Sequence, residues 1–505
     1  MGFTTICHGR VVAIAGCAML RCTLFVAAFV IMVTGLCVPS SSVGAEPGGI
    51  SRPNIVLIMA DDLGYAELGC YGQQKIKTPN IDRMAAEGMR FTQHYTSAPV
   101  CAPARCCLMT GRHAGHALVR DNAERRPPDY LFKDTFGGQY PLPADTVTMA
   151  RLLKQAGYVT GAFGKWGLGG VGTSGDPLNQ GFDRFFGYNC QRHAHNLYPT
   201  YLVDDRQQRM LPGNTAGVTG ETYAPQQVAD EMLAFVRAHR ERPFFVYYPT
   251  VIPHLALQVP EAELAVYRGQ WPETPYTGES YQPHPTPRAA YAAMISFFDK
   301  QVGRLMGLLK ELELDDRTIV LLTSDNGTTH LAEQVDAEFF QSVGSLRGLK
   351  GSVYEGGIRV PLVARWPGHI QPGTESDLLA AHYDLLPTLL DVAGLAPPVE
   401  TDGLSYLPTL FGRPDLQRSH AFLLWDFAGY GGQLAVRYGR WKGIWRDLRK
   451  NPNASIELYD LAADVGETKD VAREHPEVVS KLEEIVRQAR RRPQEAAFQF
   501  GPYLD

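Results

Sequence analysis

The sequence predicts an α/β fold made of one large domain and a smaller C-terminal subdomain, and three observations support this prediction. Short apolar runs rich in β-branched residues alternate with segments of helical periodicity. The chain has 505 residues, of which 45% are hydrophobic and 20% charged, so it can bury a large core. No internal repeat or low-complexity tract interrupts the pattern.

Residues 1–45 are predicted to be a signal peptide. Arg21 precedes an apolar run over residues 24–33, and the small residues 43–45 form a cleavage site before Glu46. The alternative is a lipoprotein box ending at Cys17. We therefore expect an exported protein, periplasmic or extracellular, without a transmembrane anchor once the signal is removed, because no later segment approaches the length of a membrane span.

Two predicted strands end in acidic pairs. The apolar run 55–60 leads into Asp61 and Asp62, and the apolar run 318–323 leads, after one serine, into Asp325 and Asn326. Open α/β sheets bind ligands at the carboxyl ends of parallel strands, so the two pairs can meet in one crevice. Their oxygens suit a Ca²⁺ ion, with Mg²⁺ as the alternative. Taken singly, each pair also fits a turn or a helix cap.

A third element gives these pairs a context. Cys101-Ala-Pro-Ala-Arg105, followed by Thr-Gly-Arg at 110–112, resembles the signature of the type I, formylglycine-dependent sulfatases, the arylsulfatase family. In that family a formylglycine-generating or sulfatase-maturating enzyme oxidises the cysteine to an aldehyde, and the aldehyde hydrate attacks the sulfate. The resemblance implies that Cys101 is the nucleophile and contacts the metal, and that Arg105 holds the formylglycine. It also implies the metal ligands Asp61, Asp62, Asp325 and Asn326.

Further matches follow in the family's order. Gly164-Lys165-Trp166 resembles the element whose lysine contacts the sulfate, and His254 resembles the histidine that protonates the leaving-group oxygen. Lys350 resembles a second sulfate-binding lysine. The resemblance implies an alkaline-phosphatase-like fold, in which helices flank a central mixed β-sheet.

The sequence departs from the family at Gly167, where the family commonly has a histidine that contacts the sulfate or the nucleophile. His116 and His195 are the candidates to replace it as substrate-binding residues, and the sequence does not choose between them. The glycines after position 167 allow a wide loop near the site. Position 104 is also alanine, where the family most often has serine.

The catalytic domain is predicted to span 46–412 and the C-terminal α+β subdomain 413–505, with the boundary near Pro414. Strands of an antiparallel sheet are expected at 434–437 and 441–444. The resemblance implies that residues 458–460 and a final helix over 476–490 complete this subdomain. Within the predicted catalytic domain, the proline-rich stretch 271–287 is expected to be an irregular excursion that lines the pocket. The five cysteines outside the leader are assigned no disulfide.

The sequence therefore predicts a secreted, metal-dependent sulfatase that acts on a sulfated small molecule or polysaccharide, with carbohydrate esters favoured. One alternative is a phosphodiesterase or phosphonate monoester hydrolase on the same scaffold. Another is a non-catalytic relative that binds sulfated glycans. The formal net charge of −5 gives no support to nucleic-acid binding.

Overall fold

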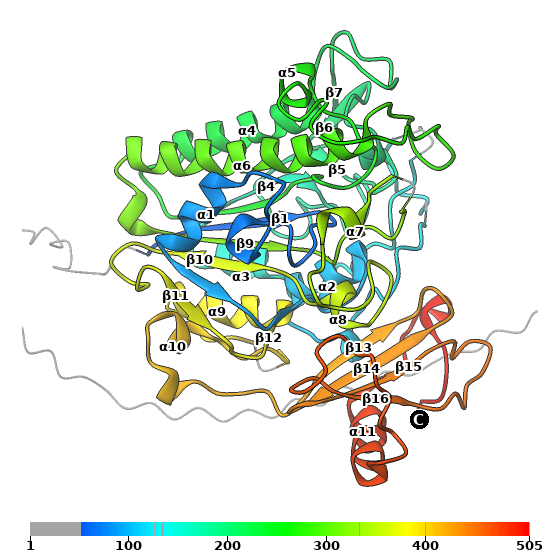
Figure 1. Ribbon diagram of the computed structural model, residues 1–505. Coiled ribbons are helices and arrows are strands. Elements are labelled where there is room, and N and C mark those ends of the chain that lie inside the picture. The colour runs from blue at the N-terminus through cyan, green and yellow to red at the C-terminus, as the bar shows by residue number, and fades with distance from the viewer. Residues whose placement is uncertain (1–51, 126, 133–135, 333, 399, 504–505) are drawn as a thin grey trace, which may run out of the picture. The chain divides into compact units, whose positions relative to one another are not determined.

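A mixed ten-stranded sheet lies at the centre of the described residues (Figure 1). The computed structural model describes residues 52–125, 127–132, 136–332, 334–398 and 400–503, so the predicted leader lies outside the described residues. In sheet order the strands are β11 (Thr374–Ser376), β2 (Met89–Phe91), β10 (Leu362–Arg365), β9 (Thr318–Ser324), β1 (Asn54–Ala60), β8 (Phe244–Pro249), β4 (Val159–Lys165), β5 (Arg184–Tyr188), β6 (Tyr201–Asp204) and β7 (Gln207–Met210).

The five central strands β9, β1, β8, β4 and β5 run parallel, whereas β10 and β6 are antiparallel to their neighbours. This confirms the predicted mixed sheet. Both strands predicted to end in acidic pairs are present and adjacent, in a register that places Ala60 beside Ser324. The backbone N–H of Asp325 donates to the carbonyl of Ala60 at 3.0 Å, so the two acidic pairs begin side by side.

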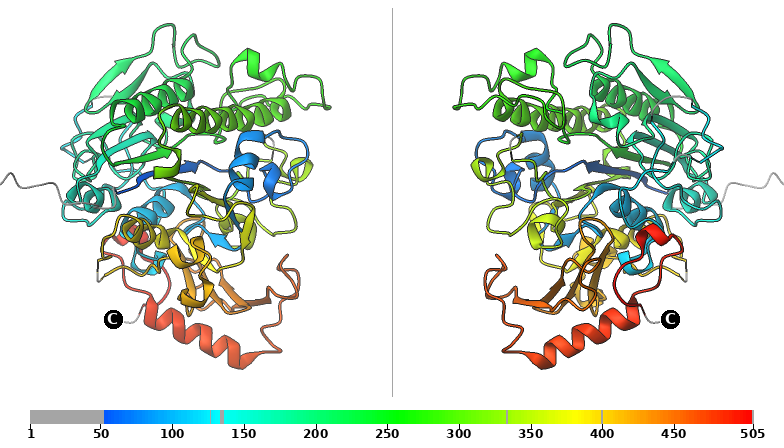
Figure 2. Two further views of the ribbon diagram at one scale, coloured as in Figure 1. Left: turned by 90° about the vertical axis from the view of Figure 1, so that its left-hand side faces the viewer. Right: turned by 90° about the vertical axis from the view of Figure 1, so that its right-hand side faces the viewer.

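Helices cover both faces of the sheet, because alternate side chains of its strands point to opposite sides. Val56 and Ile58 of β1 pack into a core with α1, α4 and α6, while Leu57 and Met59 pack into a second core with α2, α3 and α9. Figure 2 shows α4 and α6 side by side over one face. The helices are α1 (Pro79–Ala86), α2 (Cys101–Thr110), α3 (Met149–Gln155), α4 (Ala224–Ala238), α5 (Glu261–Leu264), α6 (Pro287–Glu311), α7 (Ala337–Phe340), α8 (Glu355–Ile358), α9 (Leu385–Val392) and α10 (Leu407–Leu410).

A four-stranded antiparallel sheet lies after the predicted domain boundary in the sequence. It belongs to the same compact unit as the large sheet. Leu482 and Ile485 of the last helix pack into the second core. The Trp425 indole N–H donates to the carbonyl of Thr96 at 2.8 Å, which fastens this sheet to the segment before α2. The remaining elements are β3 (His94–Tyr95), β12 (Ala380–Ala381), β13 (Leu423–Phe427), β14 (Gln433–Tyr438), β15 (Trp441–Trp445), β16 (Glu457–Asp460) and α11 (Pro476–Ala489).

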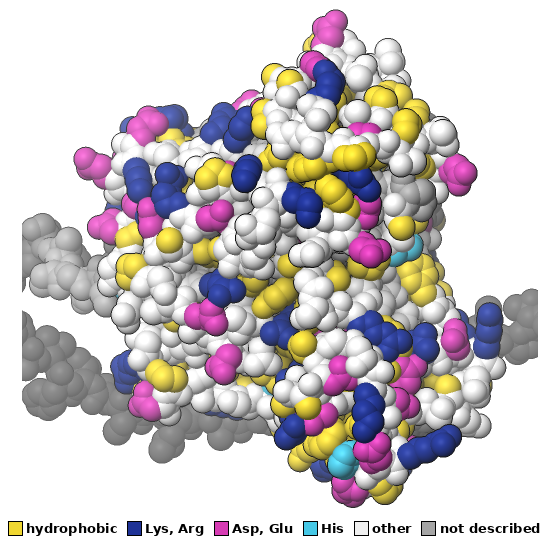
Figure 3. Space-filling model, in the orientation of Figure 1, with side chains coloured by type: hydrophobic (Ala, Val, Ile, Leu, Met, Phe, Trp, Pro, Cys, Tyr) yellow, Lys and Arg dark blue, Asp and Glu magenta, His cyan; other side chains and the backbone are white. Residues whose placement is uncertain are grey.

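Three further properties of the described chain concern its helices, its surface charge and its cysteines. None of its helices combines the length and the apolar character that a membrane crossing requires. On the face shown in Figure 3, basic and acidic side chains are interspersed. Its described cysteines form no disulfide.

Candidate active site

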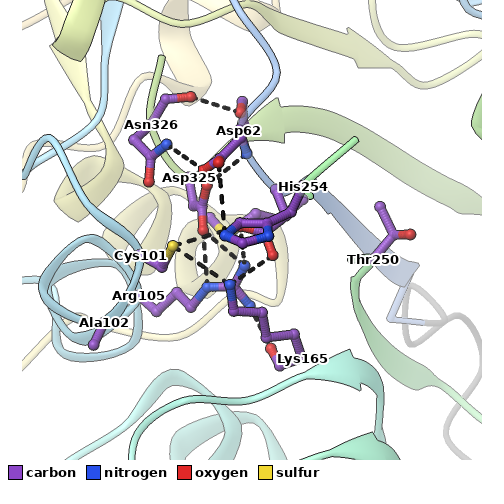
Figure 4. A network of polar contacts seen from close by, with 12 residues as sticks. Asp62, Cys101, Ala102, Arg105, Lys165, Thr250, His254, Asp325 and Asn326 are labelled. Carbon is purple, nitrogen blue, oxygen red and sulfur yellow. Dashed lines mark hydrogen bonds and ion pairs between the residues drawn. The ribbon is translucent and has the colours of Figure 1, made fainter. Parts of the chain in front are cut away.

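The carboxyl ends of four neighbouring strands deliver the predicted residues to one place (Figure 4). Asp61 and Asp62 follow β1, Asp325 and Asn326 follow β9, and His254 follows β8. Lys165 is the last residue of β4. The arrangement thus follows from the parallel order β9-β1-β8-β4, which sets these four ends along one edge of the sheet.

Three carboxylates face three cations in this cluster, and all six side chains are buried or nearly so. The ion pairs are Lys165 Nζ to Asp61 Oδ2 at 2.7 Å, Lys350 Nζ to Asp62 Oδ1 at 2.7 Å, and Arg105 Nη2 to Asp325 Oδ2 at 2.7 Å. Arg105 also donates to the carbonyl of Lys165.

The neighbouring carboxylates keep the two lysines charged. Burial by itself lowers the pKa of Lys165 and of Lys350, but the carboxylates outweigh it, and both pKa values are raised. Two fixed positive charges are therefore held in a water-poor site, where they act strongly on an anion.

Cys101 lies at the start of α2, between the two lysines. Its Sγ is 3.4 Å from Lys165 Nζ, 3.6 Å from Lys350 Nζ and 3.5 Å from Asp61 Oδ1. Burial raises the pKa of this thiol to about 12, and Asp325 adds to the effect. As a thiol, Cys101 stays protonated at neutral pH and is a weak nucleophile.

Asn122, which the sequence analysis missed, caps the helix that carries Cys101. Its side-chain oxygen accepts the Ala102 N–H at 2.8 Å, and Val100 at the N-cap position provides no such bond. Asparagine is a good capping residue, but this one acts from twenty residues downstream, so no local pattern points to it.

The oxygen atoms of the cluster fit a hard divalent cation. Asn326 donates its amide Nδ2 to Asp62 at 2.7 Å, while its Oδ1 is buried and has no hydrogen-bond partner among the residues that the structure describes. A buried amide oxygen without a partner is costly unless it binds something positive. Together with the carboxylates of Asp61, Asp62 and Asp325 it offers the oxygen set that Ca²⁺ and Mg²⁺ prefer.

His254 and His195 form a stacked pair beside the cluster. Their ring centroids are 4.9 Å apart with an interplanar angle of 14°. His254 Nδ1 donates to the carbonyl of Leu255 at 2.5 Å, which leaves Nε2 directed at Asp62, 3.7 Å away. Burial, and then Lys350 and Lys165, lower the pKa of His254 well below its usual range, so it is neutral here. Tyr281, from the proline-rich excursion, completes the group at 5.0 Å from His195.

Gly164 and Gly167 both have positive φ, at 135° and 78°. A Cβ on Gly164 would lie 1.9 Å from the Pro249 carbonyl oxygen, so only glycine allows β4 to end this close to β8. A Cβ on Gly167 would meet the side chain of Gln191 at 2.8 Å. Beyond it the loop is buried and folded on itself, with Gly175 Cα 2.6 Å from a Cβ built on Gly169, so the expected wide loop was wrong.

His116, the other candidate for the missing histidine, lies in a different group. Its Nδ1 is bound to Asp402 at 2.9 Å, and its ring stacks on His113 at 4.1 Å. The three side chains have the composition of a metal site. However, the Gly115 N–H donates to His113 Nδ1, which places the proton of the neutral ring on Nε2, the atom that faces Asp402. His116 is therefore held by Asp402, and His195 is the histidine that reaches the Cys101 cluster.

Comparison with known families covers most of the chain. The family model described as Sulfatase matches residues 53–395, and that described as N-sulphoglucosamine sulphohydrolase, C-terminal, matches 349–492. Human arylsulfatase A is 35% identical over 491 residues, which span 89% of this chain and 90% of that protein. Human N-acetylgalactosamine-6-sulfatase is 31% identical over 478 residues, spanning 87% and 86%.

Solved structures agree with this. A crystal structure of Ps i-CgsB in complex with k-i-k-neocarrahexaose superimposes with a TM-score of 0.72 at 26% identity, covering 88% of this chain and 94% of that one. A phosphonate monoester hydrolase of Agrobacterium radiobacter gives 0.62 at 23% identity, covering 87% and 95%, which shows a shared fold. The alkaline-phosphatase-like fold implied by the sequence is thereby confirmed.

Proposed function

Because this chain belongs to the sulfatase family and is a sulfuric ester hydrolase, we propose that it is an exported, metal-dependent enzyme that removes sulfate from sulfated carbohydrates. The observation that carries the proposal is the position of Cys101. It lies within 3.6 Å of two buried lysines, beside three carboxylates and an amide oxygen. No simpler role explains so many buried charges around one thiol.

The chain's own residues divide the work as follows. Lys165, Lys350 and Arg105 neutralise the sulfate oxygens as negative charge develops on them. His254 gives a proton from Nε2 to the departing alcohol oxygen, after the negative substrate has raised its pKa. His195 supports the His254 ring from the side and replaces the histidine that is absent at Gly167.

Two groups complete this machinery. If Cys101 is converted to formylglycine, the hydrate of that aldehyde would supply the nucleophilic hydroxyl for the sulfur and a second hydroxyl for the release of sulfate. When bound by Asp61, Asp62, Asp325 and Asn326, a Ca²⁺ ion, or Mg²⁺ in its place, supplies further positive charge against the sulfate. The proposal includes a maturating enzyme as partner, which converts Cys101 during export.

Carbohydrate esters are favoured as substrates by the relatives. One acts on N-acetylgalactosamine 6-sulfate by its name, and another was solved with an oligosaccharide bound. The signal peptide predicted over residues 1–45 agrees with a substrate outside the cytoplasm.

The test is a comparison of ester classes. Metal-replete enzyme carrying the modified residue is assayed with 4-nitrophenyl sulfate, 4-nitrophenyl phosphate and a phenylphosphonate monoester under identical conditions. We expect kcat/KM for the sulfate to be the highest by at least about ten-fold, because the family model and the relatives that match most of this chain are sulfatases. A higher value for either phosphorus ester would move the assignment to the phosphodiesterase and phosphonate hydrolase branch of the same fold.

A further inference from the structure

A cavity of about 400 Å³ opens directly beside the histidine pair. His195 and Tyr281 are among its lining residues. The proline-rich excursion provides one wall through residues 278–283, and the segment around Asn196 and Thr200 provides another. The excursion predicted from the sequence thus does line a pocket.

The direction in which the alcohol leaves selects this cavity. In the proposed mechanism the sulfate group is held between the lysines, so the ester oxygen that His254 protonates lies on the His254 side of the sulfur. The ring neighbours of His254 are His195 at 4.9 Å and Tyr281 at 6.0 Å, and both line the cavity. The alcohol therefore extends past these two rings.

A second cavity, of about 450 Å³, is lined by residues on both sides of Lys350 in the sequence, including Gly348 and Gly351, and serves as the alternative. Its wall is Tyr430, whose ring rests on Gly351, where a Cβ would come within 2.1 Å of it. Its lining residues include neither histidine of the stacked pair. An alcohol that extends past His195 and Tyr281 therefore does not enter this second cavity.

We propose that the cavity behind His195 and Tyr281 receives the alcohol portion of the substrate, and that this portion is a single sugar ring without further negative charge. The inference rests on the proposed function and deepens it. The rings of Tyr281 and Phe136 suit the apolar faces of a pyranose, while Thr200 and Glu279 suit its hydroxyls. The volume is near the lower end for ligand pockets, which fits one ring rather than a chain.

The charge of the lining disfavours a second acidic group. Arg192, at the rim, is paired with Glu124. Glu279 is exposed, and no ion pair to it is found within the described parts of the chain. A second sulfate or a uronate would meet this carboxylate without compensation, since like charges at close range repel.

The test uses Tyr281→Leu with Tyr430→Leu as its matched control. Each is assayed with the best substrate from a panel of monosulfated hexoses and N-acetylhexosamines, and with inorganic sulfate as a competitive inhibitor. We expect Tyr281→Leu to raise KM for the sugar about ten-fold, the equivalent of about 1.4 kcal/mol, with the Ki of inorganic sulfate unchanged. Tyr430→Leu should change neither value.

A third variant is independent of any folding defect at Tyr281. Glu279→Gln, at an exposed position, should raise kcat/KM for a disulfated sugar relative to its monosulfated parent about five-fold, by removing a repulsion of about 1 kcal/mol. An unchanged ratio would overturn the charge selection.

The outcomes separate the inference from the proposed function. A larger effect of Tyr430→Leu than of Tyr281→Leu would move the alcohol to the other cavity. Turnover of 4-nitrophenyl sulfate with no activity on any sugar of the panel would overturn the inference and leave sulfate ester hydrolysis standing. Inactivity of the modified, metal-replete enzyme toward every ester would overturn both.

Discussion

Replacing Lys350 by methionine tests the electrostatic core of the site. Methionine keeps much of the side-chain length and removes the charge. The Lys350 Nζ lies 3.6 Å from Cys101 Sγ, the atom at the reacting position, and 2.7 Å from Asp62 Oδ1. Without it, one of the two lysine charges that face the sulfate is lost.

The expected magnitude follows from that distance. Two unit charges about 3.6 Å apart interact by about 5 kcal/mol at an effective dielectric constant of about 20. Removing one group that stabilises developing negative charge costs about 3–4 kcal/mol in other enzymes. We therefore expect kcat/KM to fall by about 10³.

The assay also has a readout in pH. After burial, Lys350 is the largest cause that lowers the pKa of His254. Its removal should raise that pKa, and because the proton donor must be protonated, the alkaline limb of the kcat profile should move to higher pH. The control is Lys300→Met, an exposed lysine paired with Glu263, which should stay within two-fold of the parent enzyme.

Steady-state kinetics from pH 5 to 9 on folded, metal-replete protein measure both the fall in kcat/KM and the position of the alkaline limb. Thermal unfolding confirms that the variant is folded before the rates are compared. A Lys350→Met enzyme within about ten-fold of the parent, with an unmoved alkaline limb, would refute the assignment of Lys350 to the sulfate.

Three further outcomes are expected. Chelation of the metal should lower the melting temperature of the protein, and added Ca²⁺ should restore it. Asn326→Ala should weaken Ca²⁺ binding, measured by calorimetry, about 10–100-fold. An unchanged Ca²⁺ affinity would show that Asn326 is not a metal ligand. His195→Ala should lower kcat for sugar sulfates about ten-fold more than for 4-nitrophenyl sulfate, whose leaving group needs no proton; equal losses would contradict a role beside the proton donor. Burial lowers the pKa of His113 to about 4, so the native state binds fewer protons than the unfolded chain between about pH 6.5 and 4, and the free energy of unfolding falls as the pH falls through that window. His113→Asn should remove up to about 3 kcal/mol of this fall in the free energy of unfolding, measured by urea unfolding at each pH. An unchanged dependence of that free energy on pH would refute the assignment of the fall to His113.

The parts of the site that could be predicted from the sequence were those that short, local sequence patterns specify. The strands ending at Asp61 and at Asp325 are continuous apolar runs followed by polar residues, and both are present nearly as expected. Their meeting needs only one further fact, that the strands are parallel neighbours, which the family resemblance implied. The Cys101 motif is equally local, because its residues share one helix.

The sequence could not decide whether His116 or His195 lies near Cys101, because that depends on the tertiary path of the chain after each histidine. β5 runs parallel to β4 and ends at Tyr188, which brings the following segment, with His195, alongside the end of β4. His116 instead meets Asp402, nearly three hundred residues away in sequence. Neither contact has a local signature.

Tyr281 and β13 were missed for related reasons. The stretch around Tyr281 was expected to be an irregular excursion that lines the pocket, but no pattern singled out Tyr281, because its contact with His195 arises from tertiary packing. β13 spans Leu423–Phe427, five residues buried on both sides, a run too short to distinguish from other buried segments by its pattern.

The central claim is that residue 101 is a formylglycine in the working enzyme. The most direct measurement is mass spectrometry of the tryptic peptide spanning residues 91–105, from protein recovered after its natural export. The account predicts the mass in which an aldehyde replaces the side-chain thiol of Cys101, together with a hydrazone on treatment with a hydrazine reagent. An unmodified cysteine in active protein would contradict the proposed mechanism.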